Sequence, residues 1–413
     1  MTATTPATRG STLDFLRTNA SFLVAGVTIS FTSSYGQTFF IALFAAQIMA
    51  TVALTDGQWG LLYAVATTVS AAAMVFVGPV TDRLRVRHLA TITCLALAGA
   101  CLLMAGAGHW ALLGIAVFVL RFAGQGMMSH LAALAMARWF VATRGRALSI
   151  SAMGFALGQA VLPIVFVAGM AVLDWRVLWV VAAGLVTATI PLLLRLLRLE
   201  RTPQSLAAEK SVAGMADRHW TRADMLRHPL FWLLIPLMLG PPAFGTALFF
   251  HQVHLVAAKD WTLAGYVALL PAFTLVSVLV TLTSGAVLDR VGASGMMQIY
   301  LLPFAAAFIL MGQAETLAGA ALALIVFGLG TGMQATVPTA FWAEFYGTRH
   351  LGEIKALAAG IMVLGSALGP GLTGWVIDQG IDFPGQMGVI ALYFLGAAAL
   401  ATLGVARAQL RRR

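Results

Sequence analysis

Long apolar runs alternate with short polar stretches along the whole chain. A window of about 19 residues finds twelve such runs, and a helix of about 20 residues crosses the roughly 30 Å hydrocarbon core of a bilayer. The predicted spans are residues 20–47, 59–81, 89–106, 110–137, 147–173 and 177–197, then 231–257, 263–288, 296–312, 317–342, 354–377 and 387–405. The pattern predicts an all-α membrane protein with twelve transmembrane helices.

The runs fall into two groups of six. We therefore expect an N-terminal tail over residues 1–19, a six-helix bundle over 20–197, a polar linker over 198–228, a second six-helix bundle over 229–406, and a basic tail over 407–413. The tail at the start lacks the short apolar core and small-residue cleavage site of a signal peptide, so the first span is expected to be retained.

Composition agrees with burial in lipid. Apolar residues make up 60% of the chain and charged residues 10%, with a mean hydropathy of +0.90, whereas soluble proteins have about 45–50% and about 25%. This balance excludes a soluble metabolic enzyme, a secreted disulfide scaffold and a disordered chain. The net charge of +10 could indicate a nucleic-acid partner, but its distribution has another explanation.

The basic residues lie almost entirely on one side of the predicted spans. Of the 25 lysines and arginines, the loops opposite the termini hold only Arg176 and Lys259, and Arg121 lies inside a span. Lys and Arg in short loops resist translocation. We therefore expect both termini and the linker to be cytoplasmic, in an integral protein of the bacterial cytoplasmic (inner) membrane, with the lipid bilayer and not nucleic acid as the partner of the positive charge.

The two halves share an internal repeat. Asp289 lies 207 residues after Asp82, and the same offset separates further pairs: Gly78 and Gly285, Arg83 and Arg290, Gly158 and Gly365, Pro163 and Pro370, and Trp59 and Tyr266. Two parallel six-helix repeats, with the substrate held where they meet, are one known way to build a transporter.

Dispersed motifs give the chain a resemblance to the major facilitator superfamily. They are Gly-x-x-x-Asp-Arg-x-Arg-x-Arg over 78–87, its second copy over 285–292, Arg-Phe-Ala-Gly-Gln-Gly over 121–126 and Gly-x-x-x-Gly over 154–158. Arg85 replaces the glycine usual in the first motif. Residues 35–40, 139–146 and 347–352 resemble the bacterial branch near monocarboxylate and oxalate/formate transporters. The resemblance implies the major facilitator fold, in which two pseudo-symmetric bundles alternate between inward and outward access.

The resemblance also implies a cytoplasmic gate. The residues carried over are Gly78, Asp82, Arg83, Arg87, Gly285, Asp289 and Arg290. The carboxylates would face helix N-termini and loop arginines, while Gly78 and Gly285 would permit close helix approach. The alternative is that the two motif copies are solvated helix ends.

Arg121 is the most informative residue inside the membrane. It lies about 16 Å into the span 110–137 at 1.5 Å per residue, close to mid-depth, and no acid is predicted at that level. A guanidinium at the bilayer centre costs about 2.5–3.5 kcal/mol, so it should face the bundle interior or a wet cavity. One reading is a site for an anion that arrives and leaves; the other is a structural bond to carbonyls and hydroxyls of the first span.

Polar residues elsewhere complete the predicted substrate site. The first span is polar over 30–38, and the candidates are Tyr35, Gln37, Thr38, Arg121, Gln125, His251 and Gln334. The seventh span contains Gly240, Pro241 and Pro242, which we expect to interrupt it. His251 and His254 follow near the outer surface, where a proton-sensitive, substrate-contacting or purely interfacial role is open and a metal site lacks further ligands.

These observations predict a monomeric secondary transporter, not an enzyme, with no cofactor or metal and no nucleotide-binding phosphate loop. The expected substrate is a small organic anion, such as a monocarboxylate, moved by alternating access with a proton. One alternative is proton-driven efflux of an amphipathic drug or metabolite, although Gln159 follows Gly158 where such antiporters usually have proline. A second is a non-transporting membrane receptor.

Overall fold

The computed structural model describes residues 12–77, 84–140, 143–198 and 214–410, which form helices and connecting loops without a strand. The first half contains α1 (Thr12–Thr32), α2 (Thr38–Ile41), α3 (Ala45–Val52), α4 (Asp56–Val77), α5 (Val86–Ala105), α6 (Trp110–Leu120), α7 (Ser129–Trp139), α8 (Arg144–Gly169) and α9 (Trp175–Leu196). After the short α10 (Arg222–Arg227), the second half contains α11 (Pro229–Phe250), α12 (Gln252–Ala258), α13 (Leu263–Val267), α14 (Leu270–Val291), α15 (Ala293–Ile299), α16 (Leu302–Gln313), α17 (Leu317–Gln334), α18 (Val337–Tyr346), α19 (Leu351–Asp378) and α20 (Phe383–Leu410).

The helices reproduce the predicted spans. Among the described residues, ten helices are long and apolar enough to cross a membrane, and a pair bent by 48° in the first span makes eleven. The predicted span 59–81 corresponds to α4, which is helical to Val77 before the chain leaves the described residues. The all-α membrane class is confirmed.

The helices of the two halves pack in corresponding pairs. In the first half, α1 packs on α8, α5 on α9, and α4 on α6. In the second half, the equivalent pairs are α11 with α19, α16 with α20, and α14 with α17. The repeat seen in the sequence is therefore also a repeat of helix packing.

Small residues allow the closest of these pairs. A Cβ on Gly154 of α8 would lie 2.9 Å from the backbone nitrogen of Phe31, at the end of α1. In the second half, a Cβ on Gly365 of α19 would lie 2.8 Å from the carbonyl oxygen of Leu239 in α11. Small side chains let membrane helices approach to backbone contact, where van der Waals packing holds them together.

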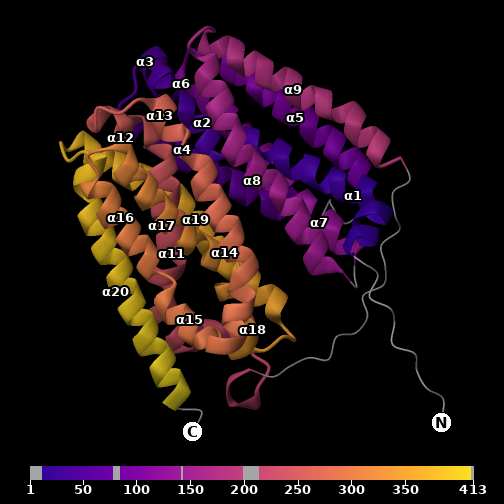
Figure 1. Cartoon of the computed structure of the whole chain (residues 1–413), viewed down its shortest axis with the longest axis vertical. Helices are drawn as coiled ribbons and strands as arrows, with labels where there is room; N and C mark the ends of the chain where they lie inside the picture. Colours follow the sequence, from indigo (N-terminus) through magenta and orange to yellow (C-terminus); the bar gives the residue numbers. More distant parts are fainter. Residues whose placement is uncertain (1–11, 78–83, 141–142, 199–213, 411–413) are drawn as a thin grey trace.

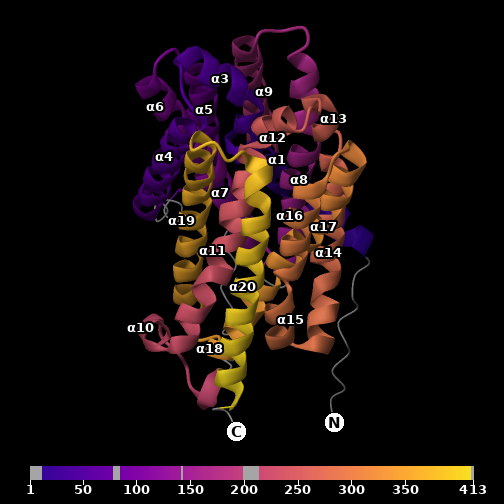
Figure 2. The same cartoon turned by 90° about the vertical axis from the view of Figure 1, so that its left-hand side faces the viewer.

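The two bundles meet at one end of the molecule, and they diverge toward the end at which α20 finishes (Figure 1). Helix α4 packs against α19, and α8 packs against α14 and α13. Under the internal repeat these are equivalent contacts, because the second and fifth spans correspond to the eighth and eleventh. Figure 2 shows α12 and α13 at the same end as α3, which we call the closed end.

The expected interruption of the seventh span at its prolines is wrong. Helix α11 is continuous through Pro236, Pro241 and Pro242. Pro241 cannot donate to the carbonyl of Leu237 four residues earlier, and the hydroxyl of Tyr300 donates to that oxygen instead, at 3.3 Å. The helix ends after Phe250, and the break falls at His251, where φ is −92° and ψ is 20°.

The described part of the linker is anchored to the second half. The backbone nitrogen of Trp220 donates to the carbonyl of Tyr346 in α18 at 3.2 Å. Thr221 and Asp224 form a capping box that begins α10, and the hydrogen bonds from Thr221 lower the pKa of the Asp224 carboxyl. The N-terminal turn of this short helix is thereby satisfied.

The glycine contact between α1 and α8 predicts a stability difference. Gly154→Val would force side-chain atoms into the backbone of α1 and should cost about 1–3 kcal/mol of stability through overpacking. Gly184→Val on α9 is the matched control, because a Cβ there meets nothing within 4 Å. Thermal unfolding in detergent, followed with a thiol-reactive dye that reports exposure of the buried Cys94 and Cys101, measures the difference. Equal melting temperatures for the two variants would contradict this packing.

Candidate functional site

The first span breaks in its middle, and the break builds the site. Helix α1 passes through a 3₁₀ turn, Ser33–Gly36, and Gln37 is extended with φ −87° and ψ 153°. Helix α2 begins at Thr38. Irregular backbone at membrane depth is tolerated where protein buries it or where it lines a cavity. The break frees the carbonyl of Gly36 from the regular helical pattern.

A second irregular segment lies directly opposite this break. Residues Arg121–Met128 form a π-helical stretch between α6 and α7, and single π-bulges in helices occur frequently at functional sites. A Cβ on Gly124 would lie 2.5 Å from the Cα of Gly36, so the two backbones touch. Gly124 of the Arg-Phe-Ala-Gly-Gln-Gly motif therefore allows this close approach.

Arg121 is held by the broken first span. Its side chain is 2% exposed, and Nη1 donates to the carbonyl oxygen of Gly36 at 3.2 Å and to Oγ1 of Thr38 at 3.3 Å. The guanidinium carbon lies 5.2 Å from the centre of the Tyr63 ring on α4. The hydroxyls of Tyr63 and Thr38 are hydrogen-bonded to each other. The structural reading of Arg121, bonding to first-span carbonyls and hydroxyls, thus describes its observed contacts.

These contacts leave the charge of Arg121 uncompensated. Among the described residues, no carboxylate forms an ion pair with it, and its Nε has no hydrogen-bond partner there. Neutral dipoles and the face of an aromatic ring stabilise a cation without neutralising it. Arg121 can therefore accept an anion in addition to its present partners.

The other predicted site residues fall into three places. Gln125 lies one turn beyond Arg121 in the π-helical stretch, and its buried Oε1 has no partner among the described residues. Gln37 lies at the break, and its Nε2 donates to Oγ of Ser129 at 3.4 Å. Tyr35 packs its ring against Phe31, Phe40 and Phe166 inside the first half. Gln334 ends α17 and borders a small cavity with Leu237, Tyr300 and Trp342 in the second half.

His251 lies at the closed end. It is 2% exposed, its Nε2 is 3.1 Å from the carbonyl oxygen of Pro370, and its Nδ1 is 3.8 Å from Oδ1 of Asp56. His254 places its Nδ1 3.5 Å from Oδ2 of the same aspartate. The sequence does not single out Asp56, because its partners lie about 200 residues away in the chain.

Further polar contacts join the halves at this end. Oδ2 of Asp378, the last residue of α19, accepts from Oγ1 of Thr55 at 2.7 Å and from the backbone nitrogen of Gly57 at 3.1 Å. Nε2 of Gln252 donates to the carbonyl of Phe39 at 3.1 Å. The ring of Phe250 stacks on Trp59 and contacts Tyr63, with centroids 5.4 and 4.7 Å apart. Tyr63 therefore contacts both Arg121 and Phe250, which lies at the closed end.

Those predicted gate residues that the structure describes lie at the opposite, divergent end. Gly78, Asp82 and Arg83 fall outside the described residues, whereas Arg87 lies in the first turn of α5 and Asp289 and Arg290 in the last turn of α14. A Cβ on Gly285 would meet nothing within 4 Å. The close helix approach expected at Gly285 is absent from the described part of this conformation.

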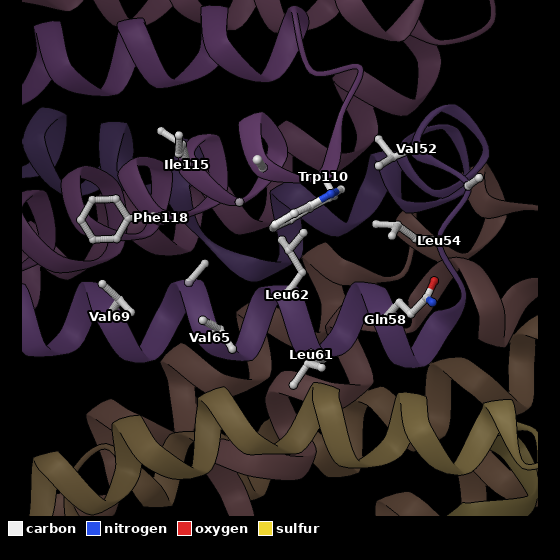
Figure 3. Close-up of a pocket in the computed structure, with 14 residues that line it drawn as sticks. Val52, Leu54, Gln58, Leu61, Leu62, Val65, Val69, Trp110, Ile115 and Phe118 are labelled. Atoms are coloured by element: carbon white, nitrogen blue, oxygen red, sulfur yellow. The ribbon is translucent and has the colours of Figure 1, made fainter.

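A cavity of about 810 Å³ lies outside this site, on the flank of the first half (Figure 3). Residues of α3, α4 and α6 line it, with Leu62, Val65, Phe118 and Trp110 among its apolar walls and Gln58 near one end. Its walls carry no charged side chain. An apolar flank cavity of this kind does not provide the counter-charge that an anion requires.

Comparison with known proteins places the fold. A sequence profile of the Major Facilitator Superfamily matches residues 26–370, and no curated protein matches the chain. A bacterial homolog of the human lysosomal transporter Spinster, inward-facing and unoccupied, is 16% identical, with 96% of this chain and 98% of that chain covered and a TM-score of 0.70. The occupied form covers 98% and 99%, at 16% identity and a TM-score of 0.68.

A variant of the nucleoside transporter NupG is also similar, at 14% identity, with 94% of this chain and 99% of that chain covered and a TM-score of 0.67. At these identities the structures establish the fold, and the sequence profile spans most of the chain. The chain belongs to the major facilitator superfamily, and it is a membrane transporter and not an enzyme.

Proposed function

We propose that the protein moves a small organic anion, of the monocarboxylate kind, across the bacterial cytoplasmic membrane by alternating access coupled to protons. The observation that carries the proposal is the buried, uncompensated guanidinium of Arg121 at the break of the first span. A carboxylate matches the planar donors of a guanidinium and forms charge-assisted hydrogen bonds with it.

The free Nε of Arg121 supports an anion over a neutral substrate. Its Nη1 already serves Gly36 and Thr38, so an incoming carboxylate would add to these bonds without displacing them. The neighbour NupG is a nucleoside transporter, and a nucleoside carries no charge to pair with Arg121. The nearby amides of Gln37 and Gln125 would then contact the rest of the anion.

The contacts between the halves support alternating access. They lie at the closed end, where α4 packs on α19, and the bundles diverge toward the end at which α20 finishes (Figure 1). The distribution of lysine and arginine predicts cytoplasmic termini, so we propose that this conformation is open to the cytoplasm. The two Spinster homolog structures are themselves described as inward-facing.

Substitution of Arg121 tests the anion site. Arg121→Gln keeps a donor for the Gly36 carbonyl but removes the charge, so uptake of radiolabelled lactate, pyruvate and formate into proteoliposomes should fall at least about tenfold, as expected for loss of a charged hydrogen bond worth about 1.5–3 kcal/mol. Arg176→Gln, in the first turn of α9 and away from the break, is the control. Normal carboxylate uptake by Arg121→Gln would refute the proposal. So would uptake of uridine at the same rate by the parent and by Arg121→Gln.

The ring of Tyr63 should contribute to the same site. Tyr63→Leu removes the aromatic face under Arg121, and loss of a desolvated cation–π contact of about 0.5–2 kcal/mol should raise the KM for the transported carboxylate about 2- to 30-fold. Tyr63→Phe keeps the face and loses only the hydroxyl bonded to Thr38, so it is the matched variant. If both variants raise KM equally, the hydroxyl and not the ring supports Arg121.

A further inference from the structure

We propose that Asp56, His251 and His254 form a proton-binding latch that holds the closed end shut, and that this latch makes the access equilibrium depend on the pH of the medium at that end. The inference rests on the proposed transport function for its physiological meaning and on the contacts between the halves for its structural basis. Asp56 belongs to the first half and both histidines belong to the second.

The contact with Pro370 fixes the tautomer of neutral His251. A backbone carbonyl only accepts, so Nε2 of His251 must carry the hydrogen that it shares with the oxygen of Pro370 at 3.1 Å. In the neutral ring Nδ1 then has a lone pair, and this lone pair faces Oδ1 of Asp56 at 3.8 Å. Two acceptors face each other, and a proton on Nδ1 converts the pair into an imidazolium bound to a carboxylate.

The distances from Asp56 to the two histidines are those of groups that are near each other but not yet hydrogen-bonded. The 3.8 Å and 3.5 Å distances from Asp56 to His251 and His254 exceed the 2.7–3.2 Å of a formed N–H···O bond. Nε2 of His254 has no partner among the described residues. A small rotation on protonation would close both gaps.

Other charged and titratable groups lie around the latch. Asp378, from the second half, accepts from the backbone nitrogen of Gly57, next to Asp56 in the chain. Lys259 is engaged with the carbonyl of Gly312 at 2.6 Å. The remaining charged or titratable side chains on the elements and loops that surround the latch are Tyr63 on α4, Asp260, Tyr266 on α13 and Asp382, with Glu353 and Lys355 at the other end of α19 and Tyr393 and Arg407 farther along α20.

The proton has access from the closed end. The side chains of Asp56 and His254 are each 22% exposed, whereas that of His251 is 1% exposed. Asp56 and His254 therefore connect the buried imidazole to the medium on that side. The bound proton belongs to the closed arrangement, because opening separates Asp56 from both histidines. By linkage, acid at this end favours closure and alkali favours opening.

The latch is also joined to the proposed anion site. Phe250, next to His251, contacts the ring of Tyr63, and Tyr63 lies over Arg121. A rearrangement that opens the latch must move Phe250 or Tyr63. Opening therefore changes the ring contacts that connect the latch to the guanidinium of Arg121.

The test measures the closed end directly, without substrate. Nitroxide labels on Val172→Cys in the first half and Gln313→Cys in the second, in a Cys94→Ala, Cys101→Ala background of the full chain, report their separation by pulsed electron paramagnetic resonance. We expect the ratio of closed to open populations to fall about tenfold from about pH 5.5 to about pH 8.5, within the 5–150-fold range of typical coupling. A pH-independent distribution would overturn the latch.

Substitutions test which side chains bind the proton. His251→Gln keeps a donor for Pro370 but cannot bind a proton, so the pH response should be lost; Asp56→Asn should also abolish it and provides a second variant if the first fails to fold. His109→Gln, an exposed histidine at the same end of the molecule, should respond like the parent. A full response in both His251→Gln and Asp56→Asn would refute the assignment.

The same measurement separates this inference from the proposed function. Arg121→Gln should lose carboxylate uptake and keep the pH response of the labels. If the parent protein transports no carboxylate but still closes in acid, the substrate assignment fails and the latch stands. If transport depends on Arg121 but the distance between the labels does not change with pH, the latch proposal is wrong and the anion-site proposal is supported.

Discussion

A single buried guanidinium determines the architecture of the first half. A membrane interior offers no water to solvate Arg121, so the protein must supply acceptors at that depth. An unbroken first span would have its carbonyls engaged within the helix. The break at Gln37 presents the carbonyl of Gly36, and the π-helical stretch that begins at Arg121 brings the two backbones into contact. Both irregularities meet at this one side chain.

The internal repeat gives the two bundles the same internal packing. Each bundle keeps the same three helix pairs, and glycines such as Gly154 and Gly365 hold these pairs at backbone distance. The interface between the bundles is built in the same way. A Cβ on Gly60 of α4 would lie 2.5 Å from a carbonyl oxygen of α19, and polar bonds and stacked aromatic rings add to this contact at the closed end. Under the proposed alternating access, opening has to separate two helices that are in backbone contact.

Much of this could be predicted from the sequence, because hydrophobic run length and periodicity are local. The spans, the repeat and the depth of Arg121 follow from residue order alone. Partners that come from tertiary packing do not: Tyr63 under Arg121, and Asp56 beside His251, are brought together by the crossing of helices distant in the chain. The seventh span shows the same limit, because its helix continues through three prolines and Tyr300, which replaces the donor missing at Pro241, comes from another helix.

The carboxylate of Asp378 has a consequence for the cost of opening. It binds the first turn of α4 from the other half of the molecule, at the positive end of that helix dipole. Thr55 and Gln58 cap the same turn from within the first half. If the halves part, the amide of Gly57 loses its carboxylate acceptor while the amides of Thr55 and Gln58 keep theirs, so the Gly57 amide must be hydrated by the medium that enters. Hydration of that helix end then accompanies separation of the two halves. A solute that lowers the water activity of that medium disfavours the open arrangement.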